Sequence, residues 1–283
     1  MDEEFFAFNY KELPLSDDFM FGEVMRRAHI CKLFLEALLE KPVARIEYIS
    51  KQEDISDSYT SHGIRLDVYL KDEKNTVYSI EMQTRAGSFL LKRIRYYQSA
   101  IDRHNLVKGE HYTMLPQSYI IIVCTEDPFG CGLALYKRKI IMEGCPDIGY
   151  DDGSHVYLLN TECTTPNACE AIMEFLRCIR SNDIDPADYH SSLMKEVCPA
   201  IAEVRDDPGK EAEYMTWQTK LMDIEHFSKM EGRAEGRAVM QAQAVQALMR
   251  KMGLLEAEAM DVLEIPEEER EACQKYLEKL DAG

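Results

Sequence analysis

The sequence lacks the features of a membrane or exported protein. No apolar run approaches the roughly 20 residues that a membrane-spanning helix needs, and the longest candidate is the short stretch of residues 119–124. Residues 1–4 are acidic where a secretion signal is basic, and no apolar core follows them. We therefore expect a cytoplasmic protein without a membrane partner.

Closely spaced metal-binding cysteines and histidines are also missing. The 9 cysteines are scattered, and neither a Cys-x2-Cys nor a His-x3-His pair occurs. This excludes the usual zinc sites and redox motifs, so most cysteines are expected to be reduced and buried. Gly130-Cys131-Gly132 lacks the rest of a dinucleotide-binding fingerprint. A cysteine nucleophile paired with one of the 7 histidines stays open, but no motif indicates it.

Positive charge is scarce overall and concentrated in one segment. The chain has 33 Lys and Arg against 51 Asp and Glu, a formal net charge of −18. This balance argues against a protein that coats nucleic acid, because Lys and Arg neutralise the phosphate backbone. Between residues 85 and 108 the balance reverses, and only Asp102 opposes the basic residues Arg85, Lys92, Arg93, Arg95, Arg103 and Lys108. Without a neighbouring active site, a solvated helix face is the simpler explanation.

The hydrophobic pattern predicts an α/β chain. Apolar residues at spacings of three and four predict helices, and short runs rich in β-branched residues predict strands. The expected order is a helix at 16–39, strands at 43–51, 63–71 and 76–83, a helix at 88–105 and a strand at 118–124. Further strands are expected at 133–141 and 155–160. Helices are expected from residue 166 onward, at 168–179, 191–204 and 211–230.

A hairpin centred on Lys74 joins the strands at 63–71 and 76–83. In this register one face is apolar throughout, with Leu66 opposite Met82, Val68 opposite Ile80 and Leu70 opposite Tyr78. The other face places Asp67 opposite Glu81 and Arg65 opposite Gln83. A slip of one residue would set apolar against polar positions, so the hydrophobic pattern fixes the register.

Two carboxylates that face each other across a hairpin repel unless a positive group lies between them. Carboxylate oxygens suit Mg²⁺, which one or two carboxylates hold together with waters and substrate phosphate oxygens. Asp67 and Glu81 therefore predict a metal site that activates water and neutralises charge on a phosphate. Gln83 projects from the same face as Glu81 and can orient that water or a phosphate oxygen. In the alternative, Arg65 pairs with either acid and replaces the metal.

Several segments, in this order, resemble the PD-(D/E)XK nuclease family transposases, also called the Rpn family of recombination-promoting nucleases. They are Leu15-Ser16-Asp17-Asp18-Phe19-Met20-Phe21, Arg65-Leu66-Asp67-Val68, Ile80-Glu81-Met82-Gln83, Arg93-Ile94-Arg95-Tyr96-Tyr97-Gln98-Ser99 and Lys108-Gly109-Glu110-His111-Tyr112. The resemblance covers about residues 12–160 closely and the C-terminal tail loosely. The ordered set is its most specific element, because an isolated Asp followed by Glu-x-Gln is common by chance.

The resemblance implies a restriction-endonuclease-like core, αβββαβ with a mixed central sheet flanked by helices. It also implies DNA cleavage that depends on Mg²⁺, for which Mn²⁺ can substitute, in recombination, mobile-element or phage-defence biology. By position Asp67 and Glu81 are the motif acids, and Gln83 stands where the wider superfamily has lysine. Glutamine offers only a dipole, so rate or metal demand can differ, although Glu-x-Gln is common in this family. Asp18 matches a first-helix metal ligand, with Glu23 as its competitor; both are also ordinary helix-start or surface residues.

In such a fold the helix at 88–105 lies beside the acids. We then expect Lys92, Arg93 and Arg95 to hold the DNA backbone and Tyr97 to pack against sugar or base. Tyr96 and Tyr97 are adjacent, so one of the two rings is expected in the core. The alternative function is a catalytically weak or inactive nuclease-fold protein that binds DNA or a protein, motivated by Gln83 and by the net charge of −18.

We expect a nuclease-like core over residues 1–162 and a helical extension over residues 163–283. Residues 231–237 of the extension contain Glu-Gly-Arg twice. Glycine costs about 1 kcal/mol inside a helix, so this repeat predicts close helix contact or a flexible joint, with tolerated surface glycines as the alternative. Two acidic amphipathic helices around Pro266 follow. A homo-oligomer formed through the extension is a further expectation.

Overall fold

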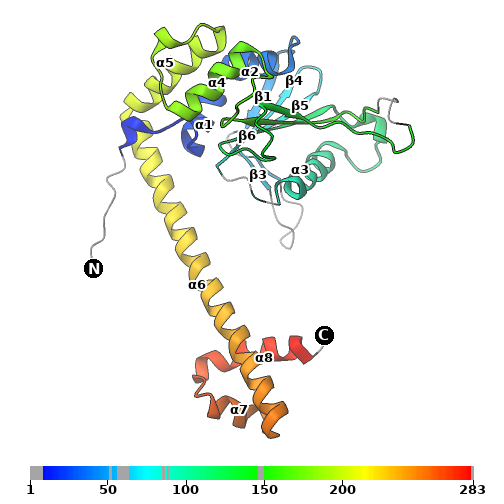
Figure 1. Ribbon diagram of the computed structural model, residues 1–283, viewed down its shortest axis with the longest axis vertical. Coiled ribbons are helices and arrows are strands. Elements are labelled where there is room, and N and C mark those ends of the chain that lie inside the picture. Colours follow the sequence, from blue (N-terminus) through cyan, green and yellow to red (C-terminus); the bar gives the residue numbers. More distant parts are fainter. Residues whose placement is uncertain are drawn as a thin grey trace. The chain divides into compact units, whose positions relative to one another are not determined.

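The computed structural model of the chain (Figure 1) describes residues 9–50, 53–55, 64–84, 87, 89–145 and 150–281. It divides into two compact units, Met1–Glu211 and Ala212–Gly283. Two expectations lie outside the described residues. They are the place of Arg85 in the basic segment and the pairing of the Arg65 side chain with Asp67 or Glu81. Among the described residues, no helix is apolar over enough of its length to cross a bilayer.

The first unit is built on a mixed sheet of six strands in the order β1-β4-β5-β6-β8-β7. Neighbours are antiparallel from β1 to β5 and parallel from β5 through β6 to β8, and β7 runs antiparallel to β8. The strand bounds are Ile46–Ser50 (β1), Val68–Asp72 (β4), Val77–Gln83 (β5), Ser118–Cys124 (β6), Leu135–Lys137 (β7) and Ser154–Asn160 (β8). A separate pair joins β2 (Glu53–Ile55) to β3 (Ile64–Leu66).

Helices cover both faces of this sheet (Figure 1). One face carries α3 (Leu90–Asn105), whose buried residues pack on apolar side chains of β5, β6 and β8. The other carries α1 (Asp18–Met25), α2 (Ala28–Leu39), α4 (Glu170–Ser181) and α5 (Ser192–Asp206). Short 3-10 turns lie at Tyr10–Glu12, Tyr112–Met114 and Pro186–Asp188. The expected restriction-endonuclease-like arrangement, a mixed sheet flanked by helices, is confirmed.

Two expected elements are interrupted. The helix predicted at 16–39 is two helices, because Arg27 has an extended backbone and restarts the chain as α2. The apolar spacing of three and four continues across this break, so the pattern concealed it. Likewise, the strand predicted at 63–71 bends at Asp67, which lies between β3 and β4. The strand predicted at 133–141 is shorter, spanning Leu135–Lys137.

The boundary between the units lies later than expected, after Glu211 rather than after residue 162. The reason is that α4 and α5 pack on the N-terminal helices of the first unit. Phe175 of α4 contacts Phe34 of α2, with ring centroids 5.0 Å apart. The Tyr10 hydroxyl donates to the carbonyl oxygen of Val204 in α5 at 2.9 Å. Helical pattern alone does not show which unit a helix joins.

The second unit has its own small core. It is formed by α6 (Pro208–Met252), which starts in the first unit, together with α7 (Glu256–Val262) and α8 (Glu267–Asp281). Buried residues include Ala242, Val245, Met260 and Leu277. The glycines of the Glu-Gly-Arg repeat, Gly232 and Gly236, are exposed within α6, and an added Cβ would meet nothing within 4 Å of either position. The structure therefore favours tolerated surface glycines.

Candidate active site

The hairpin β4–β5 has the predicted register. Val68 pairs with Ile80 and Leu70 with Tyr78. Its turn is fixed by the buried carboxylate of Asp72, which accepts backbone N–H bonds from Lys74 and Thr76, each at 2.9 Å. Because this register holds, the polar side of β5 turns toward α3, on the face opposite to Ile80.

The structure brings Asp67 and Glu81 together. The backbone N–H of Asp67 donates to Oε1 of Glu81 at 3.2 Å, and Oδ2 of Asp67 accepts the N–H of Met82 at 3.0 Å. Each acid thus binds the backbone of the other's strand at the bend where the β4–β5 ladder ends. Glu81 is only 4% exposed, because β5 is a central strand of the sheet. The polar face of the hairpin is therefore buried beneath α3 rather than solvated.

The surroundings oppose ionisation of Glu81. Burial, and then the negative charge of Asp67, raises the pKa of Glu81 well above its ordinary value. The N–H of Asp67, the charge of Arg93 and the Ser79 hydroxyl act in the opposite direction. A buried pair of carboxylates with a raised pKa is an arrangement that a cation stabilises, since a positive ion removes their mutual repulsion.

Gln83 and α3 complete the site. The Arg93 guanidinium donates a hydrogen bond to Oε1 of Gln83 and lies 5.6 Å from the centroid of the Tyr97 ring. Burial, followed by the charge of Glu81, raises the pKa of Tyr97 to about 12. Tyr97 packs against the core beneath α3, whereas Tyr96 is 38% exposed. Of these adjacent rings, Tyr97 is the one turned toward the core, and it stays partly buried there.

The four residues expected to bind DNA divide into two groups. Arg93 and Tyr97 are half-buried and lie at the acid pair, while Lys92 and Arg95 are exposed. The division follows the helix period, because Leu90 and Ile94 face the core and direct Lys92 and Arg95 outward. Arg93 and Tyr97 therefore face the acid pair, and Lys92 and Arg95 face outward from α3.

The first-helix acids lie elsewhere. Asp18 is exposed at the first position of α1. Glu23 forms ion pairs with Arg26 and, at 3.0 Å, with Lys210. Within the part of the chain that the structure describes, no three metal-ligating side chains converge. Asp18 therefore does not join Asp67 and Glu81, and these two carboxylates are the donors that the site offers.

Two residues that neighbour the site were not predicted from the sequence. The Ser79 hydroxyl donates to Oε1 of Glu81 at 3.5 Å; its position two residues before Glu81 on one strand was an available signal. Cys124 lies beside Gln83 because β5 and β6 are parallel and in register. Burial raises the pKa of Cys124 to about 12, so this thiol is not a ready nucleophile. Its proximity depends on the strand order, which residue spacing does not reveal.

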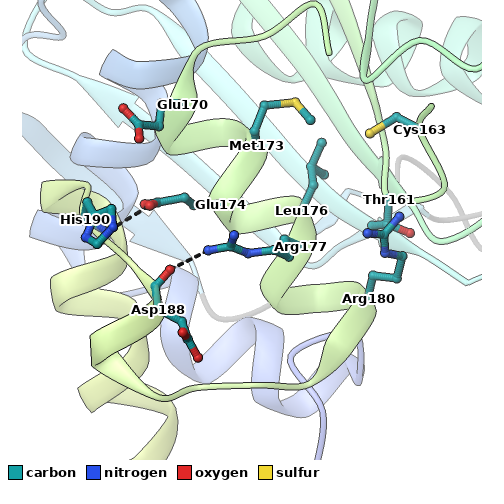
Figure 2. A pocket seen from close by; sticks show the side chains of 10 residues that line it. All are labelled: Thr161, Cys163, Glu170, Met173, Glu174, Leu176, Arg177, Arg180, Asp188 and His190. Carbon is teal, nitrogen blue, oxygen red and sulfur yellow. Dashed lines mark hydrogen bonds between the residues drawn. The ribbon is translucent and has the colours of Figure 1, made fainter. Parts of the chain in front are cut away.

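A hollow of about 350 Å³ lies apart from these residues, along α4 (Figure 2). Its charged groups already serve the local fold. Glu174 accepts the backbone N–H of His190 at 2.8 Å, and Arg177 donates to the carbonyl oxygen of Asp188 at 2.5 Å. These bonds fix the loop between α4 and α5. The acid pair, not this hollow, is the candidate active site.

The donor set fits a hard divalent cation. The two carboxylates of Asp67 and Glu81 are oxygen ligands of the kind that Mg²⁺ and Mn²⁺ take in proteins, whereas the amide oxygen of Gln83 already accepts a hydrogen bond from Arg93. A single cation of this kind would neutralise both acids.

Comparison with known proteins agrees with this chemistry. The model of the PD-(D/E)XK nuclease family transposases matches residues 18–139, a segment that contains Asp67, Glu81, Gln83 and Arg93. No curated protein and no solved structure matches the chain. The family description supports a nuclease-type function, for which DNA is the implied substrate and divalent metal ions are the typical cofactors. Over residues 18–139, less than half of the chain, the sequence is thus similar to the PD-(D/E)XK nuclease family transposases.

Proposed function

We propose that this chain is a Mg²⁺-dependent DNA endonuclease that hydrolyses phosphodiester bonds, with Mn²⁺ as an effective substitute. The observation that carries the proposal is the convergence of Asp67 and Glu81 under α3, with Gln83 and Arg93 beside them. Recombination, mobile-element exchange or phage defence is the biological setting that we infer from the family.

The residues divide the chemistry among them. Asp67 and Glu81 would hold the cation, which when bound lowers the pKa of a water and neutralises charge on the scissile phosphate. Gln83 orients the attacking water or a phosphate oxygen through its amide. Lys92 and Arg95, exposed on α3, hold the DNA backbone by charge, and the Tyr97 ring packs against the nucleotide beside the site.

Plasmid cleavage tests this function. With Mg²⁺ or Mn²⁺ the purified chain is expected to cut plasmid DNA, and Asp67→Asn or Glu81→Gln to reduce the rate by about 100-fold or more, because several kcal/mol of charge stabilisation is lost. Glu73→Gln, at an exposed turn position of the same hairpin, is the matched control. Asp18→Asn measures whether the first-helix acid contributes.

The competing function has a distinct signature. A nuclease-fold module that only binds DNA or protein would bind DNA without cutting it under any divalent ion. Full cleavage by both Asp67→Asn and Glu81→Gln would instead place catalysis at another site.

A further inference from the structure

We propose that Arg93 is a catalytic residue that places a positive charge on the scissile phosphate, and that Gln83 and Tyr97 hold its guanidinium in position. The inference rests on the proposed nuclease function and deepens it. It removes Arg93 from the group of residues that provide DNA affinity and leaves that role to Lys92 and Arg95.

The side chain of Arg93 is held on two sides. A guanidinium N–H donates to Oε1 of Gln83 on β5, and the guanidinium lies 5.6 Å from the centroid of the Tyr97 ring, one helical turn along α3. An arginine otherwise loses considerable rotamer entropy when a substrate immobilises it. Because Gln83 and Tyr97 contact the Arg93 side chain on two sides, this entropy is already lost on folding, and the charge is oriented before DNA binds.

The charge of Arg93 is directed at the acids. It acts on Glu81, on Tyr97 and on Cys124, which lie on two strands and on α3 itself. Its neighbours along the helix differ, because Lys92 and Arg95 are exposed. The helix period thus separates one inward-facing cation from two outward-facing ones.

Arg93 also keeps a donor unused. Its Nε is buried and has no hydrogen-bond partner among the described residues. A buried donor without a partner costs about 1–3 kcal/mol, so proteins seldom retain one. The planar guanidinium matches two oxygens of a phosphate, and a phosphate at the acid pair would satisfy this donor.

The charge balance indicates the same role. Asp67 and Glu81 together carry two negative charges when a divalent cation is bound, Gln83 is neutral, and attack on a phosphodiester builds further negative charge on its oxygens. A preorganised cation stabilises that charge more in the transition state than in the ground state. We therefore expect removal of Arg93 to slow the chemical step more than it weakens DNA binding.

Steady-state cleavage kinetics of the full chain test the inference. Arg93→Gln is expected to lower kcat by about 100-fold or more while KM changes less than about threefold. Lys92→Gln and Arg95→Gln are the contrasting variants, and their effect is expected mainly on KM, with a shallower salt dependence. Arg93→Lys, which keeps the charge but not the planar fork, is expected to be intermediate.

A charge exchange distinguishes catalysis from structural support. Since Gln83 and Arg93 are in contact, the double variant Gln83→Lys with Arg93→Gln returns a cation to the same place, and kcat is expected to recover at least about tenfold over Arg93→Gln alone. Arg93→Gln that cleaves like the wild type, or that loses only affinity, overturns the inference and leaves the nuclease function intact. A wild-type chain that cuts no DNA overturns both.

Discussion

At the scale of single residues, the chain places two acids where each binds the other's strand. Asp67 accepts the N–H of Met82, and Glu81 accepts the N–H of Asp67. These bonds hold the carboxylates at one point, but they do not remove their repulsion, which is greatest when both are ionised. In the metal-free protein this repulsion therefore lowers the free energy of unfolding, although the proposed function requires both carboxylates.

Glu81→Gln is expected to stabilise the metal-free protein while it removes cleavage. The fold raises the pKa of Glu81, first through burial and then through Asp67, so the folded state holds a proton that the unfolded state releases. The contribution of Glu81 to stability is thus fully present below its unfolded pKa and is lost as pH rises through the folded pKa. Near neutral pH the variant should gain about 0.5–1 kcal/mol.

Urea denaturation in the presence of a chelator measures this effect across a pH series. The decline in the free energy of unfolding with rising pH should be smaller in Glu81→Gln than in the wild type. Glu73→Gln, an exposed change, should leave the slope unaltered. A steeper decline in Glu81→Gln would contradict the assigned direction of the Glu81 pKa.

At this scale the sequence predicted the acid pair but not all of its partners. Alternation along two strands and an apolar opposite face were enough to set Asp67 beside Glu81. The contact between Gln83 and Arg93 depends on how α3 lies over β5, which no spacing along the chain encodes. Asp18 illustrates the converse, because a motif position did not bring its side chain to the pair.

At the scale of elements, the loop after β6 begins at the end of the sheet where Gln83 of β5 pairs with Cys124 of β6, and one carboxylate organises it. Asp127 accepts the N–H groups of Phe129 at 3.0 Å and Gly132 at 2.7 Å, and the Tyr136 hydroxyl at 2.8 Å. Although burial acts to raise it, these bonds lower the pKa of Asp127. The ionised carboxylate therefore organises the loop around itself.

Gly132→Ala is expected to destabilise the first unit by about 2–3 kcal/mol. Gly132 has a φ of +71°, and an added Cβ would lie 2.4 Å from Oγ1 of Thr164. Gly130→Ala is a matched control, since its φ is +66° but a Cβ there meets nothing within 4 Å, so about 1 kcal/mol of backbone strain is expected alone. Chemical denaturation of both variants compares them, and equal losses would show that the Thr164 contact is relieved without cost.

The elements themselves were largely predictable, and their interruptions were not. The strand at Ser118–Cys124 has the expected bounds because a continuous apolar run leaves no ambiguity. The break between α1 and α2 and the bend at Asp67 are decided by backbone conformation at single residues. Hydrophobic periodicity continues through both positions and so does not report them.

At the scale of the whole molecule, charge is distributed unevenly. The chain carries −18 overall, yet Lys92 and Arg95 lie exposed on the helix that covers the acid pair. Under the proposed nuclease function, DNA affinity comes from this local surface and is expected to fall with rising salt concentration. The sequence predicted this patch, and the family resemblance implied that its helix lies beside the acids. The fold adds which of its residues face the acid pair and which face outward.

Because each unit has its own core, a core substitution should destabilise mainly the unit that contains it. Leu277→Ala is expected to cost the second unit about 2–5 kcal/mol, because Leu277 is 3% exposed in a core made by α6, α7 and α8. Hydrogen exchange should accelerate in α7 and α8 and remain unchanged in β5 and β6. Leu280→Ala, at a residue 36% exposed, should have a much smaller effect. Equal acceleration in β5 would mean that the two units unfold together.

The division into units was the least predictable feature at this scale. A helical pattern begins near residue 166, but α4 and α5 pack within the first unit and only the helical segment from Ala212 onward forms the second. Side-chain periodicity identifies a helix and its buried face. It does not identify the surface against which that face packs.

Calorimetric titration of the full chain with Mn²⁺ in the absence of DNA tests the central claim most directly, namely that Asp67 and Glu81 together hold a divalent cation. We predict that the wild type binds the ion with release of protons, because Glu81 must ionise, and that Asp67→Asn and Glu81→Gln abolish the binding. Binding of equal strength in the wild type and both variants, or no binding by the wild type, would contradict the account.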